Sequence, residues 1–420
     1  MTTHSHGEQE HTHGFQEPDH FHEPDGEEER AGYRSWQTPK TPYDVFIEEE
    51  GLPVHRGIGL RDLRELPLVP WKRTGGRGHF IQLDGTEGRQ GMYVVEIPSA
   101  GALNAERHVY EEVFWVVEGR GSTEVWVEGG KKQTFEWAAG TLFAIPVNAW
   151  HRLVNASSSP ALLLGGTTAP PSINLFRNRS FIFENDFAFT DRYDGADDYF
   201  KPTDDLAPDP VRGRAMRRTQ LIPDIVNCDL PLDNQRSPGY RRIEPHMANG
   251  NFSMFIGQHE SGRYAMAHHP PGEGSAVLIC LKGKGYTFTW PRVLTINPWK
   301  EGHGDLVLRQ DYVPGGMVSA NPGGTGYYHA HYGIAQEPMR LLVFGGPRHV
   351  PPRGQPGQLE VSGNLPMEEG GRTITYAKED PFVREEYGRM IAKEGVAFRM
   401  PDWVYQTDDA KAVQKVGAGF

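Results

Sequence analysis

The stretches GALNAERHVYEEVFWVVEGRG (residues 101–121) and GTLFAIPVNAWHRLVN (residues 140–155) decide the predicted fold. Both contain runs of β-branched and aromatic residues that end at glycine, proline or acidic residues, which is typical of short strands. TEVWVEGGKKQTFEW (residues 123–137), which lies between them, predicts a hairpin with GGKK at its tip. These runs follow one another with no helical period, so they predict a sandwich or barrel and exclude a sheet of βαβ units.

The second half of the chain repeats this pattern. Strand-like runs resume with FSMFIG (252–257), RYAMAH (263–268), SAVLICLKGKGYTFTW (275–290) and MRLLVFGG (339–346). In both halves an apolar run leads into a G-x-G turn, and the first glycines, Gly119 and Gly283, are about 164 residues apart. A repeat of this kind predicts a duplication, with one barrel in each half.

We therefore predict an all-β protein of two barrels, with short helical connections and a C-terminal helix. The helix is predicted in DPFVREEYGRMIAKEGVAF (380–398), which begins at Asp-Pro and ends near Gly395. The predicted organisation is a His-rich acidic tail (1–40), a first barrel (41–170), an inter-domain connection (171–250), a second barrel (251–350) and a C-terminal extension (351–420).

The tail carries H-x-H pairs at HSH, HTH and HFH. Two interpretations remain open for it, a disordered solvated segment or a loose binder of transition metals.

Composition excludes several classes of function. The formal net charge of -12, with no basic stripe, argues against nucleic acid or an anionic membrane as a partner. No apolar run approaches the length of a bilayer span, and no secretory leader is visible. Cys228 and Cys280 are the two cysteines of the chain, too few for a disulfide framework, so we expect a cytoplasmic protein. Exposed sheet edges favour a homo-oligomer.

The spacing of polar residues in the two quoted stretches resembles the two motifs of the cupin superfamily. The first motif, G-x5-H-x-H-x3,4-E-x6-G, matches His108, Glu112 and Gly119, with Glu106 in place of its first histidine and its leading glycine displaced by one, to Gly101. The second motif, G-x5-P-x-G-x2-H-x3-N, matches Gly140, Pro146, His151 and Asn155, with Asn148 in place of a glycine. The resemblance is strongest over residues 101–155. It implies two cupin barrels of the jelly-roll (double-stranded β-helix) type and a metal-dependent enzyme.

By this resemblance, His108, Glu112 and His151 are metal ligands in the first barrel. Strand alternation places Glu106 and His108 on one face, so Glu106 is a fourth ligand or a base that orients water. Two imidazoles with one or two carboxylates suit Fe(II), Mn(II), Ni(II) or Zn(II). The alternative is a barrel without metal, in which Glu106 pairs with Arg107 or Arg152.

The second barrel departs from the family pattern, because Ala276 takes the position of Glu112 and Gly272 that of His108. His269, Glu273, His329 and His331 form a possible second metal site. The competing interpretation is a degenerate barrel with a structural role.

We expect an oxygenase that uses Fe(II) and dioxygen on a small phenolic or carboxylic substrate, because bicupin enzymes include dioxygenases. In this prediction Glu106 and Arg107 are catalytic, and Arg107 or Arg152 holds a substrate carboxylate. Two alternatives remain, a redox-neutral decarboxylase, lyase or isomerase, and a non-enzymatic metal- or ligand-binding protein.

Overall fold

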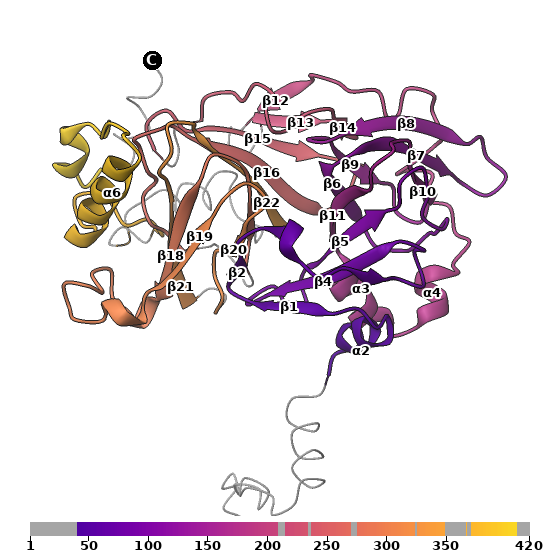
Figure 1. Ribbon diagram of the computed structural model, residues 1–420, viewed down its shortest axis with the longest axis horizontal. Helices are drawn as coiled ribbons and strands as arrows, with labels where there is room; N and C mark the ends of the chain where they lie inside the picture. The colour runs from indigo at the N-terminus through magenta and orange to yellow at the C-terminus, as the bar shows by residue number, and fades with distance from the viewer. Residues whose placement is uncertain are drawn as a thin grey trace, which may run out of the picture.

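The computed structural model describes residues 40–208, 215–233, 237–269, 275–323, 326–348, 367 and 371–409. These residues form two β-barrels that lie side by side (Figure 1). The predicted all-β fold with two barrels is confirmed. Apart from Lys40, the His-rich tail lies outside the described residues.

The first barrel consists of a large sheet and a small sheet. The large sheet has the strand order β1-β4-β5-β11-β6-β9-β14, with β3 added on β4. The small sheet has the order β10-β7-β8, and β7 with β8 is the hairpin predicted from the sequence. The strand bounds are β1 Val54–Gly57, β3 Val69–Pro70, β4 Arg77–Leu83, β5 Gly91–Ile97, β6 Glu112–Glu118, β7 Arg120–Trp126, β8 Gln133–Ala138, β9 Leu142–Ile145, β10 Trp150–Asn155, β11 Ala161–Thr167 and β14 Leu221–Ile222.

The second barrel repeats this construction. Its large sheet has the order β12-β13-β15-β16-β22-β17-β20-β2, and its small sheet the order β19-β18-β21. The strand bounds are β2 Gly59–Leu60, β12 Leu206–Pro208, β13 Ala215–Arg218, β15 Arg241–His246, β16 Phe252–His259, β17 Val277–Lys282, β18 Gly285–Pro291, β19 Leu308–Tyr312, β20 Met317–Ser319, β21 Tyr327–Gly333 and β22 Met339–Pro347.

Two strands cross between the halves of the chain. β2, from the N-terminal half, pairs with β20 of the second barrel, and β14 pairs with β9 of the first. β15 belongs to the second barrel's sheet, so this barrel begins inside the segment 171–250 that the sequence assigns to a connection. Residues 263–267 form no strand, although RYAMAH predicted one. Each barrel is therefore completed by residues from the other half of the sequence.

The strand β6 is buried on both faces. Phe114 and Val116 belong to the core inside the first barrel, whereas Val113 and Trp115 belong to a core between the two large sheets. From the second barrel that shared core includes Ile256, on β16, and residues of β17 and β22. Burial on both faces explains why EEVFWVVEG is a continuous apolar run and shows no alternation.

The helices cover the ends of the molecule (Figure 1). α2 (Pro42–Glu49), α3 (Ala169–Phe176) and α4 (Arg179–Phe183) lie against the first barrel. α6 (Pro381–Lys393) is the predicted C-terminal helix, capped by Asp380, whose side chain accepts a hydrogen bond from Phe382 N–H. Short 3-10 turns span Leu63–Glu65, Arg292–Leu294, Gly304–Leu306 and Asp402–Tyr405.

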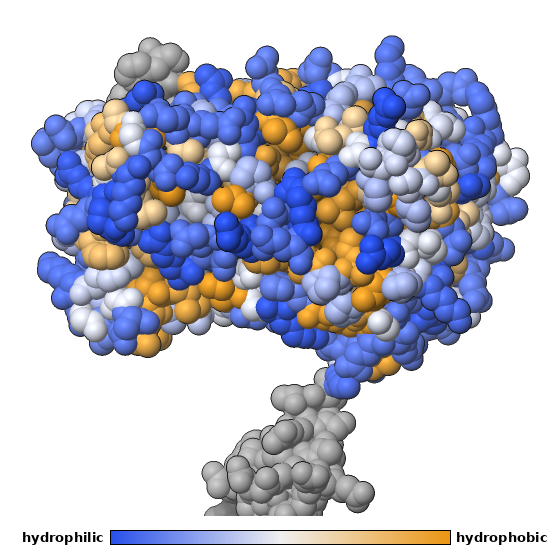
Figure 2. Space-filling model, in the orientation of Figure 1, coloured by the Kyte–Doolittle hydropathy of each residue, from blue (hydrophilic) through white to orange (hydrophobic). Residues whose placement is uncertain are grey.

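Polar residues cover most of the face seen in Figure 2, and apolar side chains reach it in patches. Val293 and Leu175 are the most exposed of the large apolar residues described, at 87% and 74%. In the described part of the chain, no helix is long and apolar enough to cross a membrane.

α6 packs on the outer face of the second barrel's small sheet through a cluster of tyrosines. Tyr264 OH donates a hydrogen bond to Glu379 and lies 3.0 Å from Tyr405 OH. Although part of Glu379 reaches solvent, burial of its carboxyl, together with the charge of Asp380, raises its pKa from 4.5 to about 8; the Tyr264 hydrogen bond and Arg384 oppose this only in part.

We predict that Glu379 makes the folded chain less stable as the pH rises. Below pH 4.5 its carboxyl is protonated in both the folded and the unfolded chain; between 4.5 and about 8 it stays protonated only in the folded chain. The stabilisation is therefore fully present below pH 4.5 and is lost as the pH rises to about 8. Thermal unfolding should show a flatter pH dependence for Glu379→Gln than for the wild type, by a few degrees in Tm. Glu385→Gln, at an exposed position of α6, is the control and should leave the slope unchanged.

Candidate metal centre

Glu112 projects into the first barrel because strand alternation places it on the same face as Phe114 and Val116. Its side chain is 1% exposed. Tyr93 lies on β5, which β11 separates from β6 in the same sheet, and its hydroxyl donates a hydrogen bond to Glu112 Oε1 at 2.5 Å. A buried carboxylate is thus held by a neutral donor, with its second oxygen turned to the barrel interior.

His151 reaches the same interior from the small sheet. It shares a face of β10 with Leu153 and Asn155, and its backbone forms a reciprocal hydrogen-bonded pair with Glu106, with N···O distances of 2.9 and 3.0 Å. Residues paired across two strands point to the same face, so the side chains of Glu106 and His151 converge. His108 lies two residues after Glu106, on the same side, and is 2% exposed.

His108, Glu112 and His151 form a compact buried cluster. His108 Nε2 lies 3.2 Å and His151 Nε2 3.6 Å from the same oxygen, Glu112 Oε2. The ligand atoms that the three residues offer lie within 4.8 Å of one another. Glu106 lies further out, with Oε1 3.9 Å from His151 Nε2 and a side chain that is 16% exposed.

Backbone carbonyls orient both imidazoles. His108 Nδ1 lies 3.0 Å from Tyr110 O, and His151 Nδ1 3.3 Å from Ala149 O. A carbonyl oxygen only accepts, so each Nδ1 carries a proton and each Nε2 is turned to the cluster. His151 Nε2 is buried and has no hydrogen-bond partner among the described residues. An unsatisfied buried nitrogen is costly, and a cation between the two Nε2 atoms and Glu112 would satisfy it.

The electrostatics favour the charge states that bind a cation. Burial opposes ionisation of Glu112, but the imidazoles of His108 and His151 and the Tyr93 hydroxyl outweigh it and lower the pKa of the carboxyl. Burial, with the adjacent His108, lowers the pKa of His151, which keeps its imidazole neutral. Burial and the charge of Glu112 raise the pKa of Tyr93 well above its usual value, so it stays a donor.

Arg73 lies beside Glu106 at the partly exposed side of the site, here called its mouth, where the two side chains are 18% and 16% exposed. Its guanidinium pairs with Glu106 and, through Nε, with Glu50 Oε2 at 2.9 Å. Burial disfavours its charge, but Glu106 and Glu50 raise the pKa of Arg73 above its usual range. The guanidinium also lies 4.8 Å from the Trp71 ring and 5.4 Å from the Phe183 ring. Neither Arg73 nor Tyr93 was among the residues predicted from the sequence. The signal that could have found Tyr93 is strand alternation, which places it on the same inward face as Val95 and Ile97.

Arg107 and Arg152, which the sequence placed near Glu106, lie away from its carboxylate. Arg107 donates to Glu184 O at 3.1 Å and lies 4.9 Å from the Trp150 ring, on the face opposite Glu106 and His108. Arg152 is exposed. The interpretation that either arginine pairs with Glu106 is therefore corrected, since Arg73 takes that place.

The predicted second site is only partly described, since Glu273 lies outside the described residues. His329 Nδ1 lies 2.9 Å from Asn321 Oδ1, and His331 Nδ1 lies 2.8 Å from Thr287 Oγ1. His268, rather than His269, pairs with His329 and has its ring centroid 4.2 Å away. Within the described ranges, the one cluster of three potential ligands compact enough for a metal is His108, Glu112 and His151.

The donor set of this cluster fits a divalent metal ion. Bonds of about 2.1 Å to imidazole nitrogen and carboxylate oxygen place ligand atoms about 3 to 3.4 Å apart, close to the separations at Glu112 Oε2. Residues 93–165, which include His108, Glu112 and His151, match the family model of the cupin domain. This match supports the resemblance to the cupin superfamily over that part of the chain.

Solved structures similar to this chain include two oxalate decarboxylases and a vicilin. A Lactobacillus farciminis oxalate decarboxylase in a formate complex is 11% identical, with a TM-score of 0.42 over 69% of this chain and 87% of that chain. A Bacillus subtilis oxalate decarboxylase, described for its Mn(II) centres, is 13% identical, with a TM-score of 0.42 over 70% and 78%. Vicilin from Corylus avellana (hazelnut) is 12% identical, with a TM-score of 0.42 over 68% and 85%. No curated protein matches the sequence of this chain.

We predict that His151→Ala removes the bound metal. Loss of an outer partner alone costs about 10- to 100-fold in metal affinity, so loss of a ligand should cost about 100-fold or more. Binding should also weaken at acid pH, because Nε2 of both imidazoles must be unprotonated to hold the cation. Metal analysis and titration at several pH values measure both effects.

His79→Ala is the matched control, because His79 is a buried histidine of the same barrel whose Nδ1 contacts Pro67 O, 3.0 Å away. It should keep the metal. Retention of metal by His151→Ala, or its loss from His331→Ala alone, would contradict the assignment.

Proposed function

We propose that the first barrel is a mononuclear metal-dependent enzyme that acts on a small carboxylic acid without net oxidation, as a decarboxylase or lyase does. The observation that carries this proposal is the Arg73 guanidinium, which pairs with Glu106, a residue whose other carboxylate oxygen lies 3.9 Å from His151 Nε2. An arginine fork recognises a carboxylate by two parallel hydrogen bonds. In the structure this guanidinium already donates to one carboxylate, that of Glu106.

The residues of the site have separate roles in this proposal. His108, Glu112 and His151 hold the cation, which when bound supplies a Lewis acid for a substrate oxygen. Arg73 exchanges Glu106 for the substrate carboxylate and so fixes its orientation. Glu106, once released, carries a proton to or from the substrate carbon, and Tyr93 keeps Glu112 in place by its hydrogen bond. Burial of the cluster excludes water.

A second candidate is a dioxygenase with Fe(II). The observation in its favour is the ligand set itself, because two histidines and one carboxylate with open positions are the donor set of non-haem Fe(II) oxygenases. The redox-neutral proposal is preferred because Glu106 adds a proton carrier at the mouth, which replacement of a carboxyl group by hydrogen requires.

Turnover in the absence of oxygen separates the two candidates. Protein loaded in turn with Fe(II), Mn(II), Ni(II) or Zn(II) is incubated with short-chain carboxylic and phenolic acids, and product formation is followed by NMR together with oxygen uptake. The proposal predicts equal turnover with and without oxygen. Oxygen uptake in proportion to product, with none formed anaerobically, would establish the dioxygenase. Tight metal binding with no turnover on any acid would favour a binding protein.

We predict that Arg73→Gln raises KM for the anionic substrate about 10- to 100-fold, because a charge-assisted hydrogen bond contributes about 1.5–3 kcal/mol. Arg73→Lys should recover part of this loss, since it keeps the charge but not the fork. Arg179→Gln is the control, because Arg179 also contacts Glu50 and the Phe183 ring. Steady-state kinetics decide, and an unchanged KM in Arg73→Gln would remove Arg73 from substrate binding.

A further inference from the structure

Glu111, the residue before the candidate ligand Glu112, joins three segments of the chain. Its backbone forms two hydrogen bonds with Thr168, from Glu111 N to Thr168 Oγ1 at 2.9 Å and from Thr168 N to Glu111 O at 3.0 Å. Its Oε1 accepts hydrogen bonds from Asn251 N at 2.6 Å and from Arg192 Nη1 at 3.3 Å. The side chain is 14% exposed. Glu111 is therefore tied to the end of β11, to the connection and to the second barrel.

The contact from the second barrel comes from the tight turn between β15 and β16. Ala248 and Asn249 both have positive φ, 51° and 48°, and Gly250 N donates to Met247 O at 2.8 Å. Two successive residues with positive φ are typical of the two-residue type I′ turn of a β-hairpin. An alanine in this left-handed conformation lowers the stability of the fold by about 1 kcal/mol or more. Gln220 accepts a hydrogen bond from Ala248 N and holds the turn in place. The turn is thus a built feature, fixed beside Glu111.

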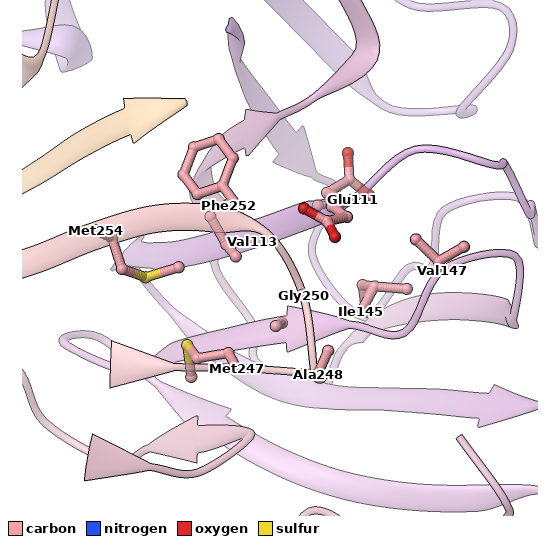
Figure 3. Close-up of a pocket in the computed structure, with 11 residues that line it drawn as sticks. Glu111, Val113, Ile145, Val147, Met247, Ala248, Gly250, Phe252 and Met254 are labelled. Carbon is pink, nitrogen blue, oxygen red and sulfur yellow. The ribbon is translucent and has the colours of Figure 1, made fainter. Parts of the chain in front are cut away.

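A small cavity lies between this turn and the start of β6 (Figure 3). Its volume is about 10 Å³, room for roughly one water molecule. Glu111 and Glu112 line it from the first barrel, and Met247, Phe252 and Met254 from the second. Glu111 Oε2 is buried and has no hydrogen-bond partner among the described residues. The side chain of Glu111 is therefore held by Oε1 alone, through the turn and Arg192.

We propose that Glu111 is a positioning residue through which the 247–251 turn of the second barrel fixes the backbone at Glu112. Glu112 begins β6, and its carboxylate has to reach both Nε2 atoms of the cluster, so a shift of the strand start moves Oε2 away from them. The second barrel thereby sets the metal affinity of the first. This inference rests on the proposed function in one respect, that Glu112 is a metal ligand.

Gly250 offers a way to disturb Glu111 from the second barrel. A Cβ at Gly250 would meet Glu111 Oε1 at 3.2 Å and Met247 O at 3.1 Å, so Gly250→Ala pushes on the carboxylate without changing any first-barrel residue. Glu111→Ala removes the acceptor, whereas Glu111→Gln keeps an oxygen for Asn251 N–H. Glu118→Ala, at the exposed end of the same strand, is the matched control, because its carboxylate forms a surface ion pair with Arg64, at 2.6 Å.

The experiment titrates the full chain with Mn(II), following the loss of the free-ion EPR signal for the Kd and the bound signal for the site geometry. We expect Glu111→Ala and Gly250→Ala to raise the Kd about 10- to 100-fold and to broaden the bound spectrum. Glu111→Gln should recover most of the affinity, and Glu118→Ala should match the wild type. The Kd of the double variant Glu111→Ala/Gly250→Ala for Mn(II) should not exceed the higher of the two single-variant Kd values, because both changes act on one contact.

The outcomes separate this inference from the proposed function. Both the proposed function and this inference would be contradicted if the wild type bound neither Mn(II) nor, in its place, Zn(II) or Co(II). A wild type that binds Mn(II), with Glu111→Ala and Gly250→Ala equal to it in Kd and spectrum, would overturn this inference alone. Should Glu111→Ala fail to fold, as judged by its Tm, Gly250→Ala gives the same decision.

Discussion

The burial of β6 on both faces is the constraint on which the rest of the structure depends. One face carries Glu112 and the aromatic core of the first barrel, and the other packs against the second barrel through Val113 and Trp115. A strand in this position has no solvent-exposed face on which to accommodate a shift, and a one-residue slip would exchange its two cores. The same packing that joins the barrels therefore also fixes the direction of the candidate ligand.

The charges of the site are buried in balanced groups. Glu112 faces two imidazoles and a neutral phenol, and Arg73 lies between two carboxylates. Removing a charge from water is costly unless a partner replaces the lost hydration. In the proposed function, a cation would add a partner for Glu112, and a substrate carboxylate would take the place of Glu106 at Arg73.

The two barrels share a frame but differ in chemistry. Gly119 and Gly283 both end a central strand with positive φ, 90° and 74°, so the repeated turn is structural in both halves. Ala276 stands where the first barrel has Glu112, and His329 and His331 contact Asn321 and Thr287 through Nδ1. Among the described residues the second barrel packs against β6 of the first and contacts Glu111 through its 247–251 turn.

The sequence by itself determined the strands, the duplication, the helix over 381–393 and the spacing that brings His108, Glu112 and His151 together. The strands and the helix depend on local features, since strand alternation, turn glycines and capping residues act over a few positions. The duplication and the cluster are visible because such local patterns recur at recognisable spacings. Only the tertiary structure decided the exchange of β2 and β14, the place of Arg73 at the mouth in preference to Arg107, and the contact of Glu111 with Asn251. Each of these joins segments far apart in the chain, and their partners are selected by the packing of the two barrels, which no local pattern records.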